Sequence, residues 1–457
     1  MTQARTMLTR RQALLTAASG GLGLAQPLRR PNVLLMLADD LGAKDTGFQG
    51  GDIRTPHLDK LAGEGVRFSQ LYSYPLCSPT RAGILTGRHP IRYGLAYSVV
   101  RPYATYGLSP AETTIAQVFK EAGYQTAIIG KWHLGHFNKR LHPLSRGFDH
   151  FYGHVNGAID YFNHTRDGGI DWQRNGRSVI EEGYATDLIA AEANRWINAR
   201  DPARPFFLYV PWNAPHTPLQ APERWLREYS SIADPKRRTF AAMVSALDAA
   251  TGAIMDNLRR QNLMEETVIV FLSDNGGPRG QGADNGPLRL GKASVYEGGI
   301  RVPGFIRYPA ALQPGKSAQV MTPTDWLPTL AAAAGIEPKT AFPLDGVNLW
   351  PLLTSGRTEP RRDLFFCVQG ETGPKQHALR DGNIKFISIA GKEAIYDVAA
   401  DPGETTDILS RMPAAAENMR RRTAEWASLH PKAEIYTGSN LHPGWVPPKD
   451  WAAAAIE

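Results

Sequence analysis

Two pairs of residues with oxygen-bearing side chains each come at the end of a fully apolar segment. Asp39 and Asp40 end one such segment, and Asp274 and Asn275 end another. Together they offer three carboxylates and one amide oxygen, the hard donors that calcium binds in proteins. The pairs therefore predict a calcium site if the fold brings them together. Taken alone, an Asp-Asp pair is also a common way to cap a turn.

A cysteine lies at a place where a helix is expected to begin. Cys77 precedes Pro79 and the apolar segment 82–85, and proline is favoured in the first turn of a helix. A helix N-terminus favours negative charge, so Cys77 could be a thiolate, or the site could hold an anionic substrate with Arg81 one turn further on. A buried structural cysteine is an equal alternative.

Lys131 and His133 follow the apolar segment 125–129. Residues two apart on an extended backbone face the same side, so these two side chains are expected to converge. Such a pair can bind an oxyanion or move a proton. A single histidine beside Trp132 can also be purely structural.

Two further basic residues lie in loops. His216 is in a segment made rigid by three prolines, Pro211, Pro215 and Pro218. Lys292 is in the glycine-rich segment 286–303. Both are candidates for binding an anion, although a solvated charge is the default for any lysine.

The elements that must position these residues alternate along the chain. Apolar segments predict strands at residues 32–38, 66–76, 125–129, 206–210, 268–273 and 304–308. Helices are predicted at residues 55–65, 113–122, 184–199, 238–261 and 324–334. This alternation predicts an α/β fold, in which ligands bind at the carboxyl ends of the strands. The candidate residues follow strands in this way.

Residues 147–175 are rich in aromatic and polar residues and poor in aliphatic ones. We predict a loop there, which either shapes a substrate pocket or packs on the surface. Beyond residue 345 short strands are expected at 363–368, 377–381, 385–389 and 394–397, with a helix at 413–429. The predicted division is therefore a larger domain, 31–345, and a smaller C-terminal α+β domain with an antiparallel sheet, 346–457.

The N-terminus has the features of an export signal. Arg10 and Arg11 precede a weakly hydrophobic run rich in glycine and alanine that ends near Ala25. Residues 1–30 are therefore predicted to be a twin-arginine signal, which places the protein in the periplasm or outside the cell. A disordered basic tail is the alternative. No segment has the length of a transmembrane span, so no membrane contact beyond the export machinery is expected.

The composition is typical of a large folded enzyme. The 457 residues are 42% hydrophobic, and the net charge of +7 is spread without long basic runs. This pattern favours solvated helix faces over a nucleic-acid surface, so no nucleic-acid partner is expected. The two cysteines, Cys77 and Cys367, exclude a disulfide scaffold.

Several of these segments resemble one enzyme family. Cys77-Ser78-Pro79-Thr80-Arg81 resembles the Cys-x-Pro-x-Arg modification motif of the Cys-type sulfatases, and residues 123–133, GYQTAIIGKWH, resemble their second signature. The segments around Asp39, His216, Asp274 and Lys292 match in the same order, so the resemblance covers most of residues 31–400. Residues 130–135, 146–149 and 160–162 are most similar to the arylsulfatase B, or N-acetylgalactosamine-4-sulfatase, group.

The resemblance implies an alkaline-phosphatase-like sulfatase fold with a large mixed central sheet flanked by helices. It implies that a formylglycine-generating enzyme oxidises Cys77 to formylglycine, whose hydrate attacks the sulfur of the substrate. By resemblance, calcium is held by Asp39, Asp40, Asp274 and Asn275 beside modified Cys77. Arg81 and Lys131 then stabilise the hydrate, His133 is a base, and His216 and Lys292 bind the sulfate.

The predicted function is therefore hydrolysis of a sulfate monoester, on a sulfated carbohydrate such as N-acetylgalactosamine 4-sulfate or on an aryl sulfate. A phosphate or phosphonate monoester hydrolase on the same scaffold is an alternative, because a cation and an aldehyde hydrate also suit phosphoryl chemistry. A non-catalytic polysaccharide-binding relative is a third possibility, if Cys77 is never modified.

Overall fold

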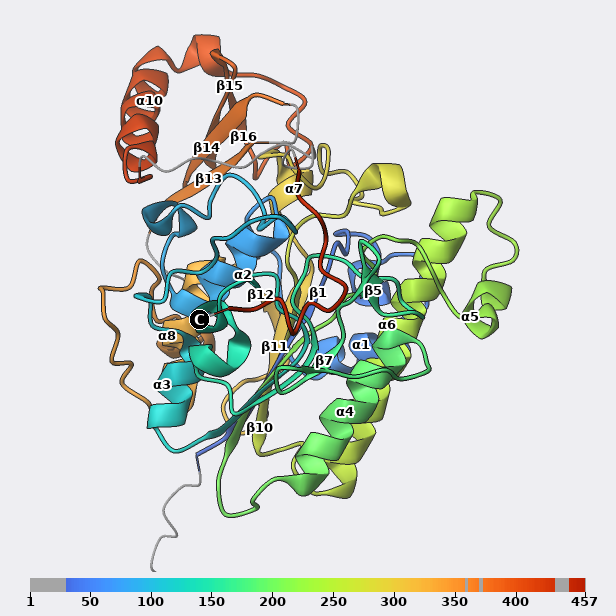
Figure 1. Ribbon diagram of the computed structural model, residues 1–457. Helices are drawn as coiled ribbons and strands as arrows, with labels where there is room; N and C mark the ends of the chain where they lie inside the picture. Colours follow the sequence, from blue (N-terminus) through green and yellow to red (C-terminus); the bar gives the residue numbers. More distant parts are fainter. Residues whose placement is uncertain (1–29, 358–360, 370–372, 432–443, 457) are drawn as a thin grey trace, which may run out of the picture. The chain divides into compact units, whose positions relative to one another are not determined.

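The computed structural model describes residues 30–357, 361–369, 373–431 and 444–456 (Figure 1). The predicted twin-arginine signal, with Arg10 and Arg11, lies outside these residues. In the part of the chain that the structure describes, no helix combines the length and the apolar character needed to cross a membrane.

Ten strands of the described chain form one mixed sheet, in the order β12-β2-β11-β10-β1-β9-β3-β4-β7-β8. Its five central strands, from β10 to β4, are parallel. The strands are β1 Asn32–Ala38, β2 Val66–Phe68, β3 Gln125–Lys131, β4 His150–His154, β7 Gln173–Arg174, β8 Arg177–Ser178, β9 Phe206–Pro211, β10 Thr267–Ser273, β11 Gly304–Arg307 and β12 Gly315–Ser317. The predicted strand at 66–76 is shorter than expected, since only its first three residues pair regularly.

Helices cover both faces of this sheet because β1 is apolar on both sides. Leu34 and Met36 pack into the core shared with α4 and α6, whereas Val33 and Leu35 face the core shared with α2, α3 and α8. Alternate residues of a strand point to opposite faces, so a doubly covered strand must be hydrophobic throughout. The helices are α1 Pro56–Gly63, α2 Cys77–Thr86, α3 Ile115–Glu121, α4 Ala185–Ala199, α5 Glu223–Glu228, α6 Pro235–Arg260, α7 Glu297–Ile300, α8 Trp326–Ala333, α9 Trp350–Ser355 and α10 Pro413–Ala427.

The prediction that residues 147–175 form only a loop is wrong in part. His150–His154 is the strand β4, which extends the sheet beside β3, and β5 Thr165–Arg166 and β6 Gly169–Ile170 form a separate small hairpin. Aromatic residues replace the usual aliphatic ones in β4, since Phe151 and Tyr152 are buried. Gly153 allows the close pairing: a Cβ there would lie 2.1 Å from the carbonyl oxygen of Gly130.

The expected C-terminal antiparallel sheet is present. It consists of β13 Asp363–Gln369, β14 Lys375–Asp381, β15 Ile384–Ile389 and β16 Lys392–Asp397, with α10 packed against it. The last described residues, 444–456, do not join this small sheet. They pack against the part of the molecule built on the large sheet, where Trp451 belongs to the hydrophobic core. The domain boundary at residue 345 stays a prediction.

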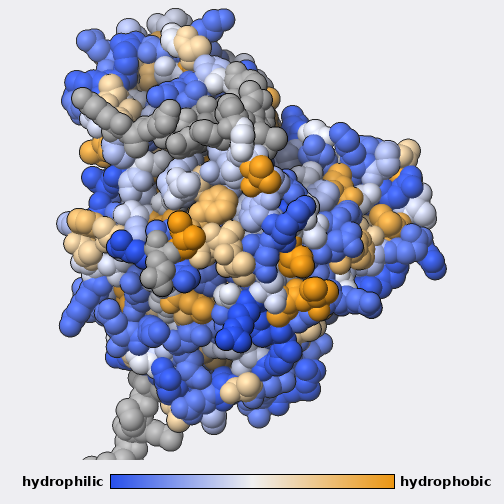
Figure 2. Space-filling model, in the orientation of Figure 1, coloured by the Kyte–Doolittle hydropathy of each residue, from blue (hydrophilic) through white to orange (hydrophobic). Residues whose placement is uncertain are grey.

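Hydrophilic residues cover most of the face shown in Figure 2, with small groups of hydrophobic residues between them.

A buried ion cluster joins the C-terminal sheet to α7. The Nζ of Lys385 in β15 lies 2.9 Å from Glu297 Oε1 and 2.8 Å from Glu404 Oε1, and all three side chains are fully buried. The Tyr72 hydroxyl donates to the other carboxylate oxygen of Glu297 at 2.7 Å. Lys385 thus pairs with two buried acids, and Arg301 adds a longer contact of 3.7 Å to Glu297 Oε2.

Lys385→Met is expected to lower the free energy of unfolding by about 3 to 5 kcal/mol, because it leaves Glu404 buried without its cation and leaves Glu297 with only the more distant Arg301. Denaturant unfolding measures this loss. Lys392→Met, on the exposed start of β16, is the matched control and should change stability by only about 0.5 kcal/mol. Equal stability of the two variants would contradict the assigned role of the cluster.

Candidate active site

The predicted site residues meet at the carboxyl edge of the parallel strands. Asp39 and Asp40 follow β1, and Asp274 and Asn275 follow the neighbouring β10. On the other side of β1, β9 leads to the loop of His216, and beyond it β3 ends at Lys131. Because these strands are parallel and adjacent, their ends lie side by side, as expected from the sequence.

Cys77 is the first residue of α2 and is buried. Its Sγ lies 3.5 Å from Asp39 Oδ1. Burial, and then the negative charge of Asp274, raise the pKa of the Cys77 thiol well above its ordinary value. The position at a helix N-terminus agrees with the sequence, but these surroundings keep the thiol neutral. The interpretation of Cys77 as a reactive thiolate is therefore disfavoured.

Each of the three aspartates at the site has a cation beside it. Lys131 Nζ donates to Asp39 Oδ2 at 2.6 Å, and Lys292 Nζ lies 2.7 Å from Asp40 Oδ1. Arg81 donates from Nε and Nη2 to Asp274 Oδ2 at 3.1 and 2.8 Å. Its third contact, from Nη1 to the carbonyl of Lys131 at 2.9 Å, fixes the guanidinium between two strand ends.

The oxygen donors of this cluster fit a hard divalent cation. Ligand atoms of Asp39, Asp40, Cys77 and His216 all lie within 4.8 Å of one another. Asn275 donates from Nδ2 to Asp40 Oδ1 at 2.7 Å, whereas its Oδ1 is buried and has no hydrogen-bond partner among the described residues. A buried amide oxygen of this kind needs a donor or a cation. Carboxylate and amide oxygens are the ligands that calcium prefers.

The charges of the acids agree with that fit. Burial favours the neutral form of Asp40, but the charge of Lys292, together with hydrogen bonds from Lys292 and Asn275, holds its pKa well below the usual range. Burial and the neighbouring Asp39 raise the pKa of Asp274 to about 6. Crowded carboxylates raise one another's pKa, and a bound cation favours their ionised forms.

His133 and His216 are neutral, and each has one unprotonated ring nitrogen that can accept a proton. Burial, followed by the charges of Lys131 and Arg81, lowers the pKa of His133 well below its ordinary value. His133 Nε2 donates to the Val100 carbonyl at 3.0 Å, so Nδ1, which has no partner among the described residues, is the proton acceptor.

His216 has the opposite arrangement of its ring. Nδ1 donates to the Thr217 carbonyl at 2.6 Å, and Nε2 faces Asp40 Oδ2 at 3.6 Å. Burial, and then the charge of Lys292, lower its pKa to about 3. An unprotonated Nε2 therefore points at the carboxylate cluster.

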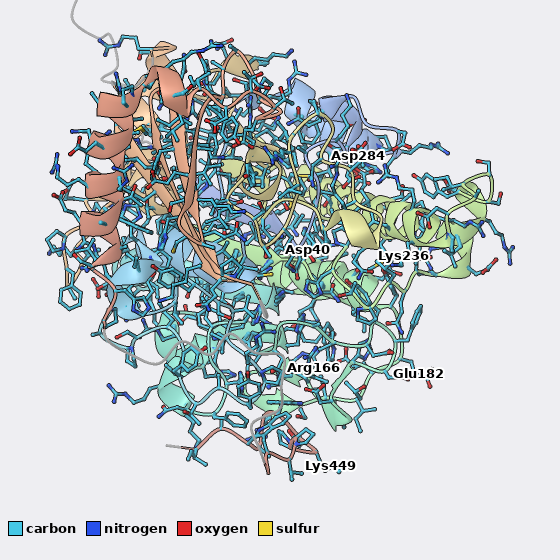
Figure 3. All side chains as sticks on the ribbon, turned by 90° about the horizontal axis from the view of Figure 1, so that it is seen from above. Asp40, Arg166, Glu182, Lys236, Asp284 and Lys449 are labelled. Carbon is cyan, nitrogen blue, oxygen red and sulfur yellow. The ribbon has the colours of Figure 1, made fainter. Side chains whose placement is uncertain are left out.

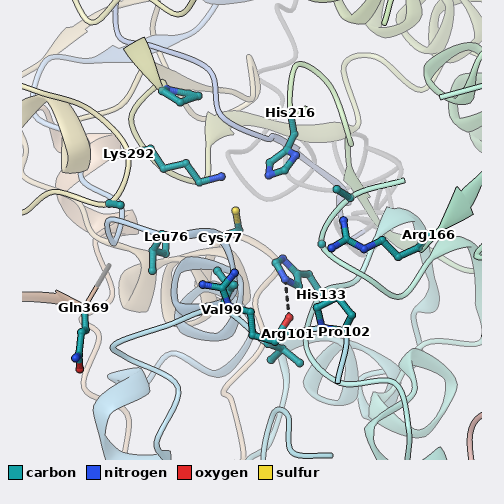
Figure 4. A pocket seen from close by; sticks show the side chains of 15 residues that line it. Leu76, Cys77, Val99, Arg101, Pro102, His133, Arg166, His216, Lys292 and Gln369 are labelled. Carbon is teal, nitrogen blue, oxygen red and sulfur yellow. Dashed lines mark hydrogen bonds between the residues drawn. The ribbon is translucent and has the colours of Figure 1, made fainter. Parts of the chain in front are cut away.

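A cavity of about 370 Å³ opens above Cys77, and His133, His216 and Lys292 face it (Figure 4). It is also lined by three polar residues that the sequence did not single out, Arg101, Arg166 and Gln369. Only Arg166 had a signal, because it lies in the segment 147–175, for which a substrate pocket is one of the two predicted roles. The cavity gives a substrate access to the Cys77 side chain.

Comparison with known proteins agrees with this geometry. A family model described as Sulfatase matches residues 31–336. Arylsulfatase A of Homo sapiens is 34% identical over 95% of this chain and 93% of its own length. Arylsulfatase J of Mus musculus is 32% identical, over 87% of this chain and 76% of its own. The crystal structure of Ps i-CgsB in complex with k-i-k-neocarrahexaose has a TM-score of 0.84 at 31% identity, covering 90% of this chain and 96% of that one.

Proposed function

This chain belongs to the sulfatase family, and from that premise we propose that it hydrolyses sulfate esters of carbohydrates through an aldehyde made from Cys77. Its reaction class is sulfuric ester hydrolysis. The expected alkaline-phosphatase-like sulfatase fold is confirmed by the mixed ten-stranded sheet of the described residues, the separate antiparallel sheet and the superposition on a related structure.

The observation that carries the proposal is the position of Cys77. Its side chain faces the cavity, its thiol is held neutral, and a ring of acids and cations surrounds it. A neutral thiol is a poor nucleophile. An aldehyde at the same position would supply a hydrated carbon whose hydroxyl oxygen can attack sulfur. The surroundings therefore suit a modified Cys77 better than the thiol itself.

The residues of this chain have separate tasks in the proposed reaction. Lys131 and Arg81 hold Asp39 and Asp274 in place and orient the carboxylates toward position 77. Lys292 lines the cavity and offers positive charge to the sulfate oxygens. His133 accepts a proton at Nδ1, the nitrogen that its contact with Val100 leaves unprotonated. His216 lies beside Asp40, and once its Nε2 is protonated it can donate a hydrogen bond to the sulfate or to the leaving oxygen.

We assign Asp39, Asp40, Asp274 and Asn275 as the residues that would hold calcium, next to residue 77. When bound, the ion supplies Lewis-acid stabilisation of negative charge on oxygen. The Oδ1 of Asn275, which has no hydrogen-bond partner in the described part of the chain, and the crowded carboxylates support this assignment.

The proposed substrate is a sulfated carbohydrate, with aryl sulfates as smaller substrates. The related structure that contains k-i-k-neocarrahexaose supports a carbohydrate. N-acetylgalactosamine 4-sulfate, expected from the sequence resemblance to arylsulfatase B, remains one candidate within this class. We further propose that a formylglycine-generating enzyme modifies this protein, and that the protein is exported to the periplasm or out of the cell.

Matched esters test the reaction type. Purified protein from a host that modifies Cys77 is expected to hydrolyse 4-nitrophenyl sulfate roughly 100-fold faster than 4-nitrophenyl phosphate or a phenyl phosphonate ester, because the site is matched to one anionic sulfate ester. Release of 4-nitrophenol measures all three rates. A faster rate on the phosphorus esters would favour the alternative, and no turnover of any ester would favour a non-catalytic protein.

A further inference from the structure

The lining of the cavity has more positive charge than one sulfate ester requires. The described lining residues include three permanent cations, Lys292, Arg101 and Arg166, and no carboxylate. Lys292 lies next to Asp40 at the bottom of the site, where the reacting sulfate must come. Cations elsewhere on the lining therefore face a different part of the substrate.

Arg166 is positioned to make such a contact. It ends β5, and its guanidinium extends into the cavity toward His133 (Figure 4). Its described ion pair is with the adjacent Asp167, from Nε to Oδ2 at 3.1 Å, and the two side chains are 30% and 36% exposed. Exposed pairs of this kind contribute little free energy, so a substrate anion can replace Asp167 at small cost.

The backbone of Arg166 is fixed by the C-terminal segment. The indole Nε1 of Trp451 donates to the Arg166 carbonyl at 3.0 Å, and Ile170 in β6 exchanges hydrogen bonds with Lys449 and Trp451, each 3.0 Å long. Trp451 is fully buried against Phe137. Figure 3 shows Arg166 and Lys449 on the same side, with Asp40 nearer the centre of the view. The hairpin is thus held in place while the guanidinium stays accessible.

We propose that Arg166 binds a second anionic group of the substrate, a sulfate or carboxylate on the sugar next to the one whose sulfate is removed. The planar guanidinium can donate two parallel hydrogen bonds to either group. Arg166 would thereby select carbohydrates with two or more charges, and Trp451 is its positioning residue. This inference rests on the proposed function, whose substrate class it narrows.

Direct binding tests the inference without turnover. Titration calorimetry is carried out on full-length Cys77→Ala protein with calcium and compares two matched pairs of sugars. The first pair is neocarrabiose 4-sulfate and the disulfate that has its second sulfate on the anhydrogalactose. The second pair is the chondroitin 4-sulfate disaccharide and its uronate methyl ester. In at least one pair the doubly charged sugar is expected to bind about 10-fold to 100-fold more tightly, as a charge-assisted hydrogen bond predicts.

Variants then assign that preference to Arg166. Arg166→Met should remove the preference for the doubly charged sugar. Arg166→Lys should keep part of the preference, because the positive charge remains but the two parallel N–H donors of the guanidinium are lost. Trp451→Phe, which loses the Nε1 donor, should reduce it. Arg177→Met removes an exposed arginine of β8, outside the cavity lining, and should keep the full preference.

Two outcomes overturn the inference: no preference for the doubly charged sugar in either pair, or a preference that survives in Arg166→Met. Failure of the proposed function is distinguishable, because it would appear as absent sulfate release from unmutated protein. The binding preference and its loss in Arg166→Met would still be measurable in that case.

Discussion

Cys77→Ala is expected to reduce sulfate release from 4-nitrophenyl sulfate by about 10⁴-fold or more, because it removes the precursor of the nucleophile. Cys77 is the first residue of α2 and its side chain faces the cavity. Alanine fits the helix and leaves the pairs between Arg81 and Asp274 and between Lys131 and Asp39 intact. The loss should therefore be chemical, with unfolding temperature nearly unchanged.

The second cysteine provides the matched control. Cys367 is equally buried, but it lies in β13 and packs against Ile91 and Trp426. Cys367→Ala should keep its sulfate release and lose only about 1 kcal/mol of stability. Unmutated protein made in a host without a formylglycine-generating enzyme should be as inactive as Cys77→Ala. Activity of that unmodified protein would show that the thiol itself reacts, and would falsify the aldehyde proposal.

The sequence allowed the inner part of the site to be predicted because strand ends have a local signature. A parallel strand buried on both faces must be apolar throughout, so the first polar residues after it mark the carboxyl edge. Asp39, Lys131 and Asp274 were found in this way, and the parallel strands bring them together. Their contacts, such as that of Arg81 with Asp274, depend on α2 crossing this edge and have no such signature.

The outer part of the site, around Arg166, could not be predicted because it has no such local signature. Arg166 lies in a two-residue strand whose position depends on Trp451, almost three hundred residues later. Neither residue belongs to a periodic pattern, so the sequence indicated only a loop and a C-terminal domain. The strand β4 was missed because Phe151 and Tyr152 fill places that usually have aliphatic residues. Elements fixed by long-range packing are least visible in local sequence.

Asp40→Asn is expected to lower kcat/KM for 4-nitrophenyl sulfate by about 10²-fold to 10³-fold and to weaken calcium binding. Asparagine keeps the shape of the side chain but removes the charge that faces Lys292 Nζ at 2.7 Å and His216 Nε2 at 3.6 Å. The substitution leaves Lys292 without its counter-ion. Elemental analysis of the purified variant, together with rates measured over a series of calcium concentrations, checks both effects.

Asp45→Asn separates loss of the metal from loss of structure. Asp45 is as buried as Asp40, but it pairs with Arg237 and accepts hydrogen bonds from the backbone N–H groups of Gly42 and Asp284. Its substitution should lower the unfolding temperature and leave the calcium dependence of the rate unchanged. Chelator should inactivate the unmutated protein and Asp45→Asn alike, with recovery on adding calcium. Full activity after complete removal of metal would contradict the assignment, because the three carboxylates would then serve only to balance Lys131, Lys292 and Arg81.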